Sequence, residues 1–214
     1  MAIDAELWKR LTGYIKILCH VSVNGMASRQ TLRKVLTGGD RRSIAQSNRA
    51  RALVEKNPDL IAHIAALADE KDWLVSQRAL DLLEKFAHDH PEWVAPYKQV
   101  FIGPLAESDK WEVRLQIVRA LPLFYWETAE LPRVKAILRE NVGHAQTFVK
   151  AWALNSLAIF AERDSKLRPL VLRALTAFEN SSSKALQARA RNIRAQNSRW
   201  SRKPGTKMGP RSRL

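Results

Sequence analysis

The sequence predicts an all-α fold in which helical hairpins repeat along the chain and stack into an α-α superhelix. Three observations lead to this prediction. A short motif recurs at a nearly constant interval, an apolar stretch precedes each copy, and the apolar positions within the copies fall three and four residues apart. That spacing places the apolar side chains on one face of a helix, where a neighbouring hairpin would bury them.

The recurring motif is expected to be the second helix of each hairpin. Residues 72–83, DWLVSQRALDLL, align with residues 110–121, KWEVRLQIVRAL, so that Val75 falls on Val113 at a shift of 38. Two further copies follow at shifts of 36 and 37, and their equivalent apolar residues are Val149 and Leu186. Because each apolar stripe is buried only if the neighbouring repeat covers it, stacking is required for stability.

The apolar stretch before each copy is expected to be the first helix of the hairpin. Asn57, His90 and Asp164 stand at helix entries, two of them before a proline, which a first helical turn tolerates. The pattern predicts two helices of roughly three to four turns in each hairpin. The four stretches are NPDLIAHIAALA (57–68), PEWVAPYKQVFIGPLA (91–106), LPRVKAILREN (131–141) and LRPLVLRALTAF (167–178).

The ends of the chain differ from the repeats. Gly38 and Gly39 are expected to end a helix, and Asp40 to cap the next one. The last residues contain Pro and Gly but almost no apolar side chains, which predicts disorder. The predicted organisation is a helical cap at 1–39, repeats at 40–196 and a basic tail at 197–214.

The charge is concentrated towards the two ends. The net charge is +15, and residues 180–214 hold ten Lys or Arg and no Asp or Glu. Residues 28–56 hold eight basic residues against two acidic ones, whereas residues 57–179 hold fifteen against seventeen. Such basic segments either solubilise the protein or form the electrostatic footprint of a phosphate-bearing partner.

Several kinds of site are not supported by the sequence. The single Cys19 cannot form an internal disulfide, which favours a reducing compartment and a cytoplasmic location. No stretch is long and apolar enough to span a membrane. The two histidines of HDHPE (88–92) lack the spacing of a helical metal site, and no phosphate loop or catalytic motif is present. We therefore expect no metal, no small-molecule cofactor and no membrane span.

The repeat resembles the HEAT repeat over residues 40–196, because a Val-Arg or Val-Lys pair opens the second helix. A finer resemblance is to a group of small bacterial HEAT-repeat proteins of uncharacterised function, which implies a fold but no reaction. It rests on GDRRSI (39–44), PEWVAPYK (91–98), EVRLQIVRALP (112–122) and FVKAWALNSLA (148–158).

The chain also resembles, more distantly, the HEAT-like alkylpurine DNA glycosylases. These enzymes hold damaged DNA on a concave basic face with tryptophans, an arginine and an essential aspartate, and Trp73 and Arg114 fall where such residues are expected. Where the resemblance places the aspartate this chain has Gln77, and where it places a second tryptophan the chain has Asn155. A glutamine is never charged and cannot stabilise a cationic sugar as a carboxylate does. The resemblance thus implies a related shape without the chemistry.

The sequence therefore predicts a non-catalytic binding module that contacts nucleic acid. In a stack of hairpins the second helices line the concave face, where their cations, with those of the GDRRSI loop and the C-terminal arm, would meet phosphates. The predicted contact residues are Arg41, Arg42, Arg78, Arg114, Arg119, Lys150, Lys184, Arg191, Arg194, Arg199, Trp200, Arg202 and Lys203.

Other interpretations stay open. Arg114 and Lys150 either contact phosphates or pair with acids such as Asp81 or Glu112. Trp200 is either incidental or stacks on a base within the basic tail. For the whole protein, the alternatives are a protein–protein interaction scaffold, whose tail only solubilises it, and a glycosylase-like enzyme.

Overall fold

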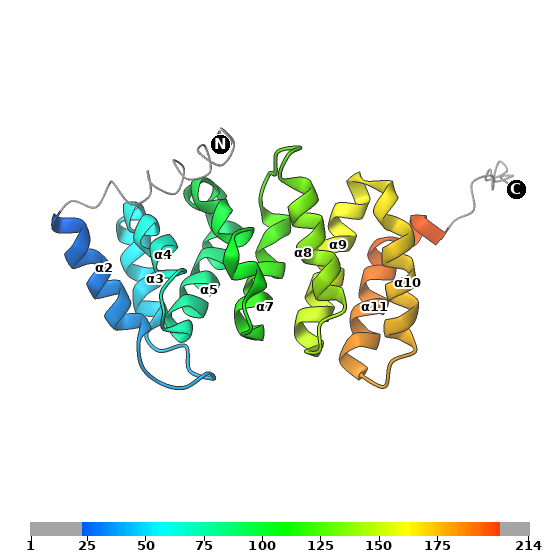
Figure 1. Cartoon of the computed structure of the whole chain (residues 1–214), viewed down its shortest axis with the longest axis horizontal. Helices are drawn as coiled ribbons and strands as arrows, with labels where there is room; N and C mark the ends of the chain where they lie inside the picture. The colour runs from blue at the N-terminus through cyan, green and yellow to red at the C-terminus, as the bar shows by residue number, and fades with distance from the viewer. Residues whose placement is uncertain (1–22, 202–214) are drawn as a thin grey trace, which may run out of the picture. The chain divides into compact units, whose positions relative to one another are not determined.

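All regular structure in the described part of the chain is helical (Figure 1). The computed structural model describes residues 23–201 and contains no strand within that range. This confirms the predicted all-α class. The chain divides after Ile137 into two compact units, which are described separately.

The first unit is built around α5 (Trp73–Asp89), which packs against the helices before and after it in the chain. Its apolar stripe, which includes Val75, Ala79 and Leu82, is buried as predicted. The other helices up to the division, with α8 crossing it, are α2 (Val23–Leu36), α3 (Ser47–Lys56), η1 (Pro58–Leu60), α4 (Ile61–Leu67), α6 (Pro91–Val94), η2 (Ala95–Phe101), η3 (Pro104–Glu107), α7 (Trp111–Ala120), η4 (Leu121–Leu123) and α8 (Leu131–Val142), where η marks a 3-10 helix.

In the second unit α9 (Thr147–Arg163), α10 (Arg168–Glu179) and α11 (Lys184–Gln196) pack against one another in pairs. The short 3-10 helix η5 (Ser165–Leu167) leads into α10, and η6 (Ser198–Ser201) follows α11. Both α9 and α11 correspond to predicted second helices, and α10 is the first helix of the last hairpin.

The predicted repeat register is confirmed by burial. The two tryptophans aligned at a shift of 38, Trp73 and Trp111, are the first residues of α5 and α7. The equivalent apolar residue stands in the first turn of each second helix and is buried in every copy. These residues are Val75, Val113, Val149 and Leu186.

The first helix of the second hairpin differs from the prediction. Instead of three to four continuous turns, residues 91–107 form the four-residue α6 and the 3-10 helices η2 and η3. Pro96 and Pro104 stand in the first turns of η2 and η3. Because proline has no N–H to donate and clashes with the preceding turn, it interrupts an α-helix. The prediction that this segment is helical is therefore confirmed, but the prolines divide it into shorter helices.

The predicted helix entries are confirmed, with different chemistry at each. The Asn57 side chain accepts a hydrogen bond from the Asp59 N–H at 3.3 Å, and Asp164 accepts one from Lys166 at 3.1 Å. The imidazole of His90 instead stacks on Trp93, with ring centroids 3.8 Å apart.

The first five residues of the predicted C-terminal tail, 197–201, belong to the folded part of the chain. Asn197 is buried, and its amide donates to the Ile193 carbonyl at 3.0 Å. Residues 198–201 then form η6. Residues 1–22 of the predicted cap and 202–214 of the predicted tail lie outside the described residues.

Candidate nucleic-acid interface

The prediction that Arg78 contacts a ligand is wrong, because its side chain is buried in the first unit. Only 2% of the residue is exposed. Its guanidinium donates to the backbone carbonyls of Leu36 at 2.6 Å, Asp40 at 3.1 Å and Ser43 at 2.8 Å. Burial lowers the pKa of Arg78, although the carboxylates of Asp72 and Asp40 act in the opposite direction. Arg78 therefore clamps the loop that joins α2 to α3.

That loop carries the GDRRSI segment and is shaped by glycine. Gly38 and Gly39 have φ angles of 94° and 69°, and a side chain at Gly39 would meet Ser43 at 2.6 Å. Asp40 does not cap α3, which begins at Ser47; its carboxylate accepts from the Arg42 N–H at 2.8 Å within the loop. The predicted helix stop is confirmed, and the predicted cap belongs to a tight turn instead.

The two arginines of the loop differ in how they are held. Arg41 pairs with Glu112 at 2.6 Å, and its guanidinium lies over the ring of Trp111, 5.7 Å from the centroid. Arg42 is exposed and makes no ion pair with a described residue. Of the two, Arg42 is the cation left for an external anion.

Arg114, Lys150 and the equivalent Gln187 follow the buried apolar residue in successive second helices. The Arg114 Nε donates to the Ser108 carbonyl at 2.6 Å, and the Gln187 Nε2 donates to the Ser181 carbonyl at 2.7 Å. Both bonds reach back six residues to the joint between the two helices of a hairpin. The polar residue that follows the buried apolar one therefore has a structural role in two copies, at Arg114 and Gln187. Lys150 is half-buried and makes no ion pair with any described residue.

Arg119 is held by a buried acid. Its Nη2 lies 3.0 Å from the carboxylate of Glu84, which is 3.3 Å from the His88 ring as well. The acids expected to pair with Arg114 and Lys150 have other partners, since Asp81 binds Lys85 at 2.6 Å and Glu112 binds Arg41.

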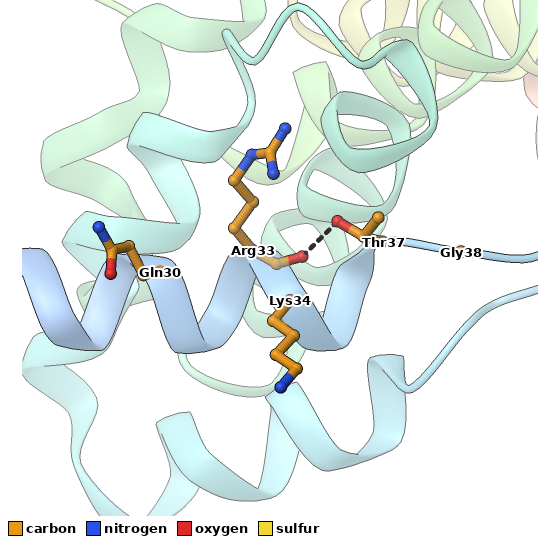
Figure 2. Close-up of a pocket in the computed structure, with 5 residues that line it drawn as sticks. All are labelled: Gln30, Arg33, Lys34, Thr37 and Gly38. Atoms are coloured by element: carbon orange, nitrogen blue, oxygen red, sulfur yellow. Dashed lines mark hydrogen bonds between the residues drawn. The ribbon is translucent and has the colours of Figure 1, made fainter.

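A shallow, open pocket lies at the C-terminal end of α2 (Figure 2). It is lined by Gln30, Arg33, Lys34, Thr37 and Gly38. Figure 2 shows Arg33 and Lys34 pointing to different sides of the helix, and the Thr37 hydroxyl donates to the Arg33 carbonyl at 2.7 Å. Arg33 also pairs with Glu70 at 3.3 Å. Because a helix C-terminus carries partial negative charge, this pocket is a poor anion site.

The second unit has a large excess of cations. Residues 138–201 contain eleven Lys or Arg and four Asp or Glu, so its own carboxylates can neutralise only a minority of the positive charges. Arg194 is one that is paired, since its Nη2 lies 2.9 Å from Glu179 and 3.2 Å from the Thr176 hydroxyl. Lys184 and Arg191 on α11 are exposed and make no ion pair with a described residue.

Helical spacing places Arg191 on a different side of α11 from Arg189, which packs against α9. The repeat shift of 37 that makes Leu186 equivalent to Val149 also makes Arg191 equivalent to Leu154. Leu154 is fully buried in α9. Arg191 and Lys184 therefore occupy the side of α11 on which a further repeat would pack.

One face of α9 carries a stripe of exposed and half-buried side chains, here called the α9 stripe: Phe148, Trp152, Asn155 and Ile159. Their spacing of four, three and four residues places them on one side of the helix. Phe148 is 58% exposed and Ile159 45% exposed, so this face remains apolar and accessible. The other residues of α9 supply its buried face, including Val149, which is fully buried.

Arg189 from α11 lies against the α9 stripe, and sequence reasoning missed it. Its guanidinium carbon is 4.2 Å from the centroid of the Trp152 ring, and its Nη1 donates to the Asn155 Oδ1 at 3.2 Å. Burial lowers the pKa of Arg189, and no described carboxylate pairs with it. The sequence did contain a signal for this contact. The repeat shift of 37 makes Arg189 the residue of α11 that is equivalent to Trp152 in α9.

The predicted contacts beyond α11 are only partly described. Trp200 is half-buried, and the guanidinium of Arg168 lies over its ring, 5.7 Å from the centroid. Trp200 thus packs against the second unit and is not an isolated residue of a tail. Arg202 and Lys203 lie outside the described residues, and the side chain of Arg199 is not described.

The described residues show no cluster of metal ligands and no membrane-spanning helix, and the two positions compared with the glycosylases are occupied by uncharged side chains. Gln77, at the position compared with the glycosylase aspartate, is half-buried on α5. Asn155, at the position compared with the second tryptophan, accepts a hydrogen bond from Arg189. Among residues 23–201 no three His, Cys, Asp or Glu side chains gather as metal ligands would. No helix within the same range has the length and apolar character needed to cross a membrane.

Comparison with known proteins defines the fold. No protein-family model matches the chain, and no curated protein matches it in sequence. A designed armadillo repeat protein in complex with the peptide (KR)4 is 15% identical, with a TM-score of 0.55 over 80% of this chain and 82% of that chain. An engineered protein is 18% identical, with a TM-score of 0.53 over 84% of this chain and 77% of that one. These likenesses confirm the class, an all-α repeat fold of the α-α superhelix type.

Proposed function

We propose that this protein is a non-catalytic HEAT-like binding module that contacts nucleic acid, with α11 and the α9 stripe as the principal surface. The observation that carries the proposal is the set of cations on α11. Lys184, Arg189 and Arg191 have no carboxylate partner among the described residues. Helical spacing puts Lys184 and Arg191 on one side of α11, whereas Arg189 projects from nearly the opposite side, towards α9.

Phosphate groups are the natural counterpart of this charge pattern. A protein cation that contacts a phosphate releases a condensed counterion, so binding strengthens with each contact and weakens with salt. The first unit is less suited to this role, because Arg78 is buried and Arg41, Arg33 and Arg119 already pair with acids. Arg42 remains as a secondary contact.

The test is fluorescence anisotropy of labelled single-stranded and duplex oligonucleotides titrated with the full-length protein at several salt concentrations. The double variant Lys184→Ala/Arg191→Ala removes two exposed charges and leaves the core intact. We expect it to weaken binding and to reduce the slope of log affinity against log salt by about 1.5, since each lost phosphate contact removes about 0.7 to 0.9.

The matched control is Lys166→Ala/Arg173→Ala. These residues belong to η5 and α10 in the same unit, and neither makes an ion pair with a described residue. The control lowers the net charge by the same amount but should leave affinity nearly unchanged. Equal losses in both variants would mean that the protein acts as a diffuse polycation. Absence of binding to every oligonucleotide would refute the proposed function.

A peptide-binding scaffold is the second candidate, and the exposed Phe148 and Ile159 favour it. The designed armadillo repeat protein was solved with the basic peptide (KR)4. The excess of cations here would instead require an acidic partner, with apolar side chains for the α9 stripe. Binding that survives high salt would support this candidate, because apolar contacts are not screened.

The non-catalytic part of the proposal rests on Gln77, which has no charge to stabilise the cationic sugar that forms as a base departs. Release of an alkylated base from DNA by the purified protein would contradict it.

A further inference from the structure

Arg189 is an unusual cation because it is half-buried without an opposing charge among the described residues. Its guanidinium lies over the Trp152 ring at 4.2 Å and is bonded at one edge to Asn155 at 3.2 Å. Both contacts hold the charged plane in a fixed position between two packed helices. The burial that lowers its pKa disfavours the charged form, and neither a neutral amide nor an indole offsets that cost as a carboxylate would.

We propose that Arg189 and Trp152 form a stacking platform for an unpaired base, and hence that the nucleic acid bound is single-stranded. This inference rests on the proposed function and narrows its ligand. The base would stack on the guanidinium plane that Trp152 supports from the other side.

The chemistry favours a base over other ligands. Guanidinium planes and aromatic rings both stack on bases, and every base offers a π face, so such sites tolerate sequence variation. Phe148 precedes Trp152 by one helical turn and is 58% exposed, which provides a second aromatic surface for the next base. Lys184 and Arg191, on another side of α11, supply positive charge for phosphates farther along the strand.

Single strands and duplexes differ in what they expose. In a duplex the faces of the bases are stacked on each other, so a protein reaches the phosphates, the sugars and the base edges but not the base faces. A cation that served phosphates alone would need no aromatic support. The fixed pairing of Arg189 with Trp152 therefore favours a ligand whose bases are free.

The experiment compares ligands that carry equal phosphate charge with and without bases. Full-length protein is titrated into labelled oligodeoxythymidylate, an abasic oligodeoxynucleotide of the same length, and a duplex. Oligouridylate is added as a fourth ligand to separate RNA from DNA. We expect base-bearing single strands to bind about tenfold more tightly than the abasic strand, a ratio that one stacked base supplies.

The decisive variant is Arg189→Lys, which keeps the charge and removes the planar group. We expect it to bind the abasic strand as the wild type does and to lose most of the preference for strands with bases. The control is Arg173→Lys on α10, which should keep the full preference. Circular dichroism and thermal unfolding establish that both variants are folded.

The outcomes separate the two proposals. If abasic, duplex and base-bearing ligands bind equally well, the platform is refuted while nucleic-acid binding stands. If no oligonucleotide binds, the proposed function fails and the platform with it. If polyglutamate displaces oligodeoxythymidylate from the wild type and binds with similar affinity, the site serves anions in general and the inference of base stacking is overturned.

Discussion

At the scale of single residues, burial decides which cations are available to a partner. Arg78 and Arg42 are both positively charged, but one is 2% exposed and holds backbone carbonyls while the other faces solvent. Their charge is the same in the sequence. The difference arises because the carbonyls of Leu36, Asp40 and Ser43 converge on a single point of α5 once the loop is folded.

The buried clamp predicts a large effect of mutation. Arg78→Ala removes all donors to these carbonyls and leaves a cavity, so we expect the free energy of unfolding to fall by about 3 to 5 kcal/mol. Arg78→Lys keeps the charge but not the fork of donors and should cost about 2 kcal/mol. Urea unfolding followed by circular dichroism measures both. Trypsin should also cut faster after Arg41 and Arg42 in the Ala variant.

The matched control is Arg51→Ala. Arg51 pairs with Glu55 at 2.7 Å and Asp89 at 2.9 Å, yet its side chain is 39% exposed. An exposed ion pair contributes at most about 1 kcal/mol. If Arg78→Ala destabilises the protein no more than Arg51→Ala does, the clamp has no energetic role.

At the scale of helices, the sequence predicted the second helices better than the first ones. An apolar residue every three or four positions is enough to define a helix that packs on its neighbours, and Val75, Val113 and Val149 are buried accordingly. The spacing of apolar residues says nothing about backbone hydrogen bonds. It therefore did not predict that Pro96, which lacks an N–H, would interrupt the first helix of the second hairpin.

Side-chain pairs between neighbouring second helices were the hardest feature to predict. Trp152 and Arg189 are 37 residues apart in the sequence, which is one repeat period. Glu84 and Arg119 are 35 residues apart, which is nearly one period. The repeat places such residues side by side. It does not say which cations are neutralised there, since that depends on where the few carboxylates fall.

The starts of the second helices differ in their caps, which predicts a stabilising change. Asp72 accepts from the Leu74 N–H at 3.0 Å at the start of α5, whereas Gln146 at the start of α9 makes no side-chain cap bond. Gln146 has extended backbone angles, φ −77° and ψ 126°, as a capping residue requires. We expect Gln146→Asp to raise the free energy of unfolding by about 0.5 to 1 kcal/mol.

Two further variants complete this comparison, again by urea unfolding. Asp72→Ala should cost about 1 kcal/mol, and Gln146→Ala should change little because no cap bond is lost. A Gln146→Asp variant no more stable than Gln146→Ala would show that α9 gains nothing from a carboxylate cap.

At the scale of the whole molecule, the two units differ in charge balance. Residues 23–137 hold seventeen basic and fifteen acidic side chains, whereas residues 138–201 hold eleven and four. A large excess of one sign opposes the compact state through self-repulsion, and salt screens that repulsion over about 10 Å at 0.1 M. Salt should therefore act on the two units differently.

Hydrogen exchange followed by mass spectrometry resolves this difference within the intact protein. On going from low to moderate sodium chloride, amides of α10 and α11 should exchange about two- to fivefold more slowly, as expected if screening stabilises the second unit by about 0.5 to 1 kcal/mol. Amides of α4 and α5 should change little, because that unit is nearly neutral and its pairs with Glu84 and Glu70 are already formed. Sucrose, which stabilises compact states without screening charge, should slow exchange in both units alike. Equal salt effects in the two units would mean that the excess charge of the second unit does not oppose its folding, and that its cations are tolerated without a partner.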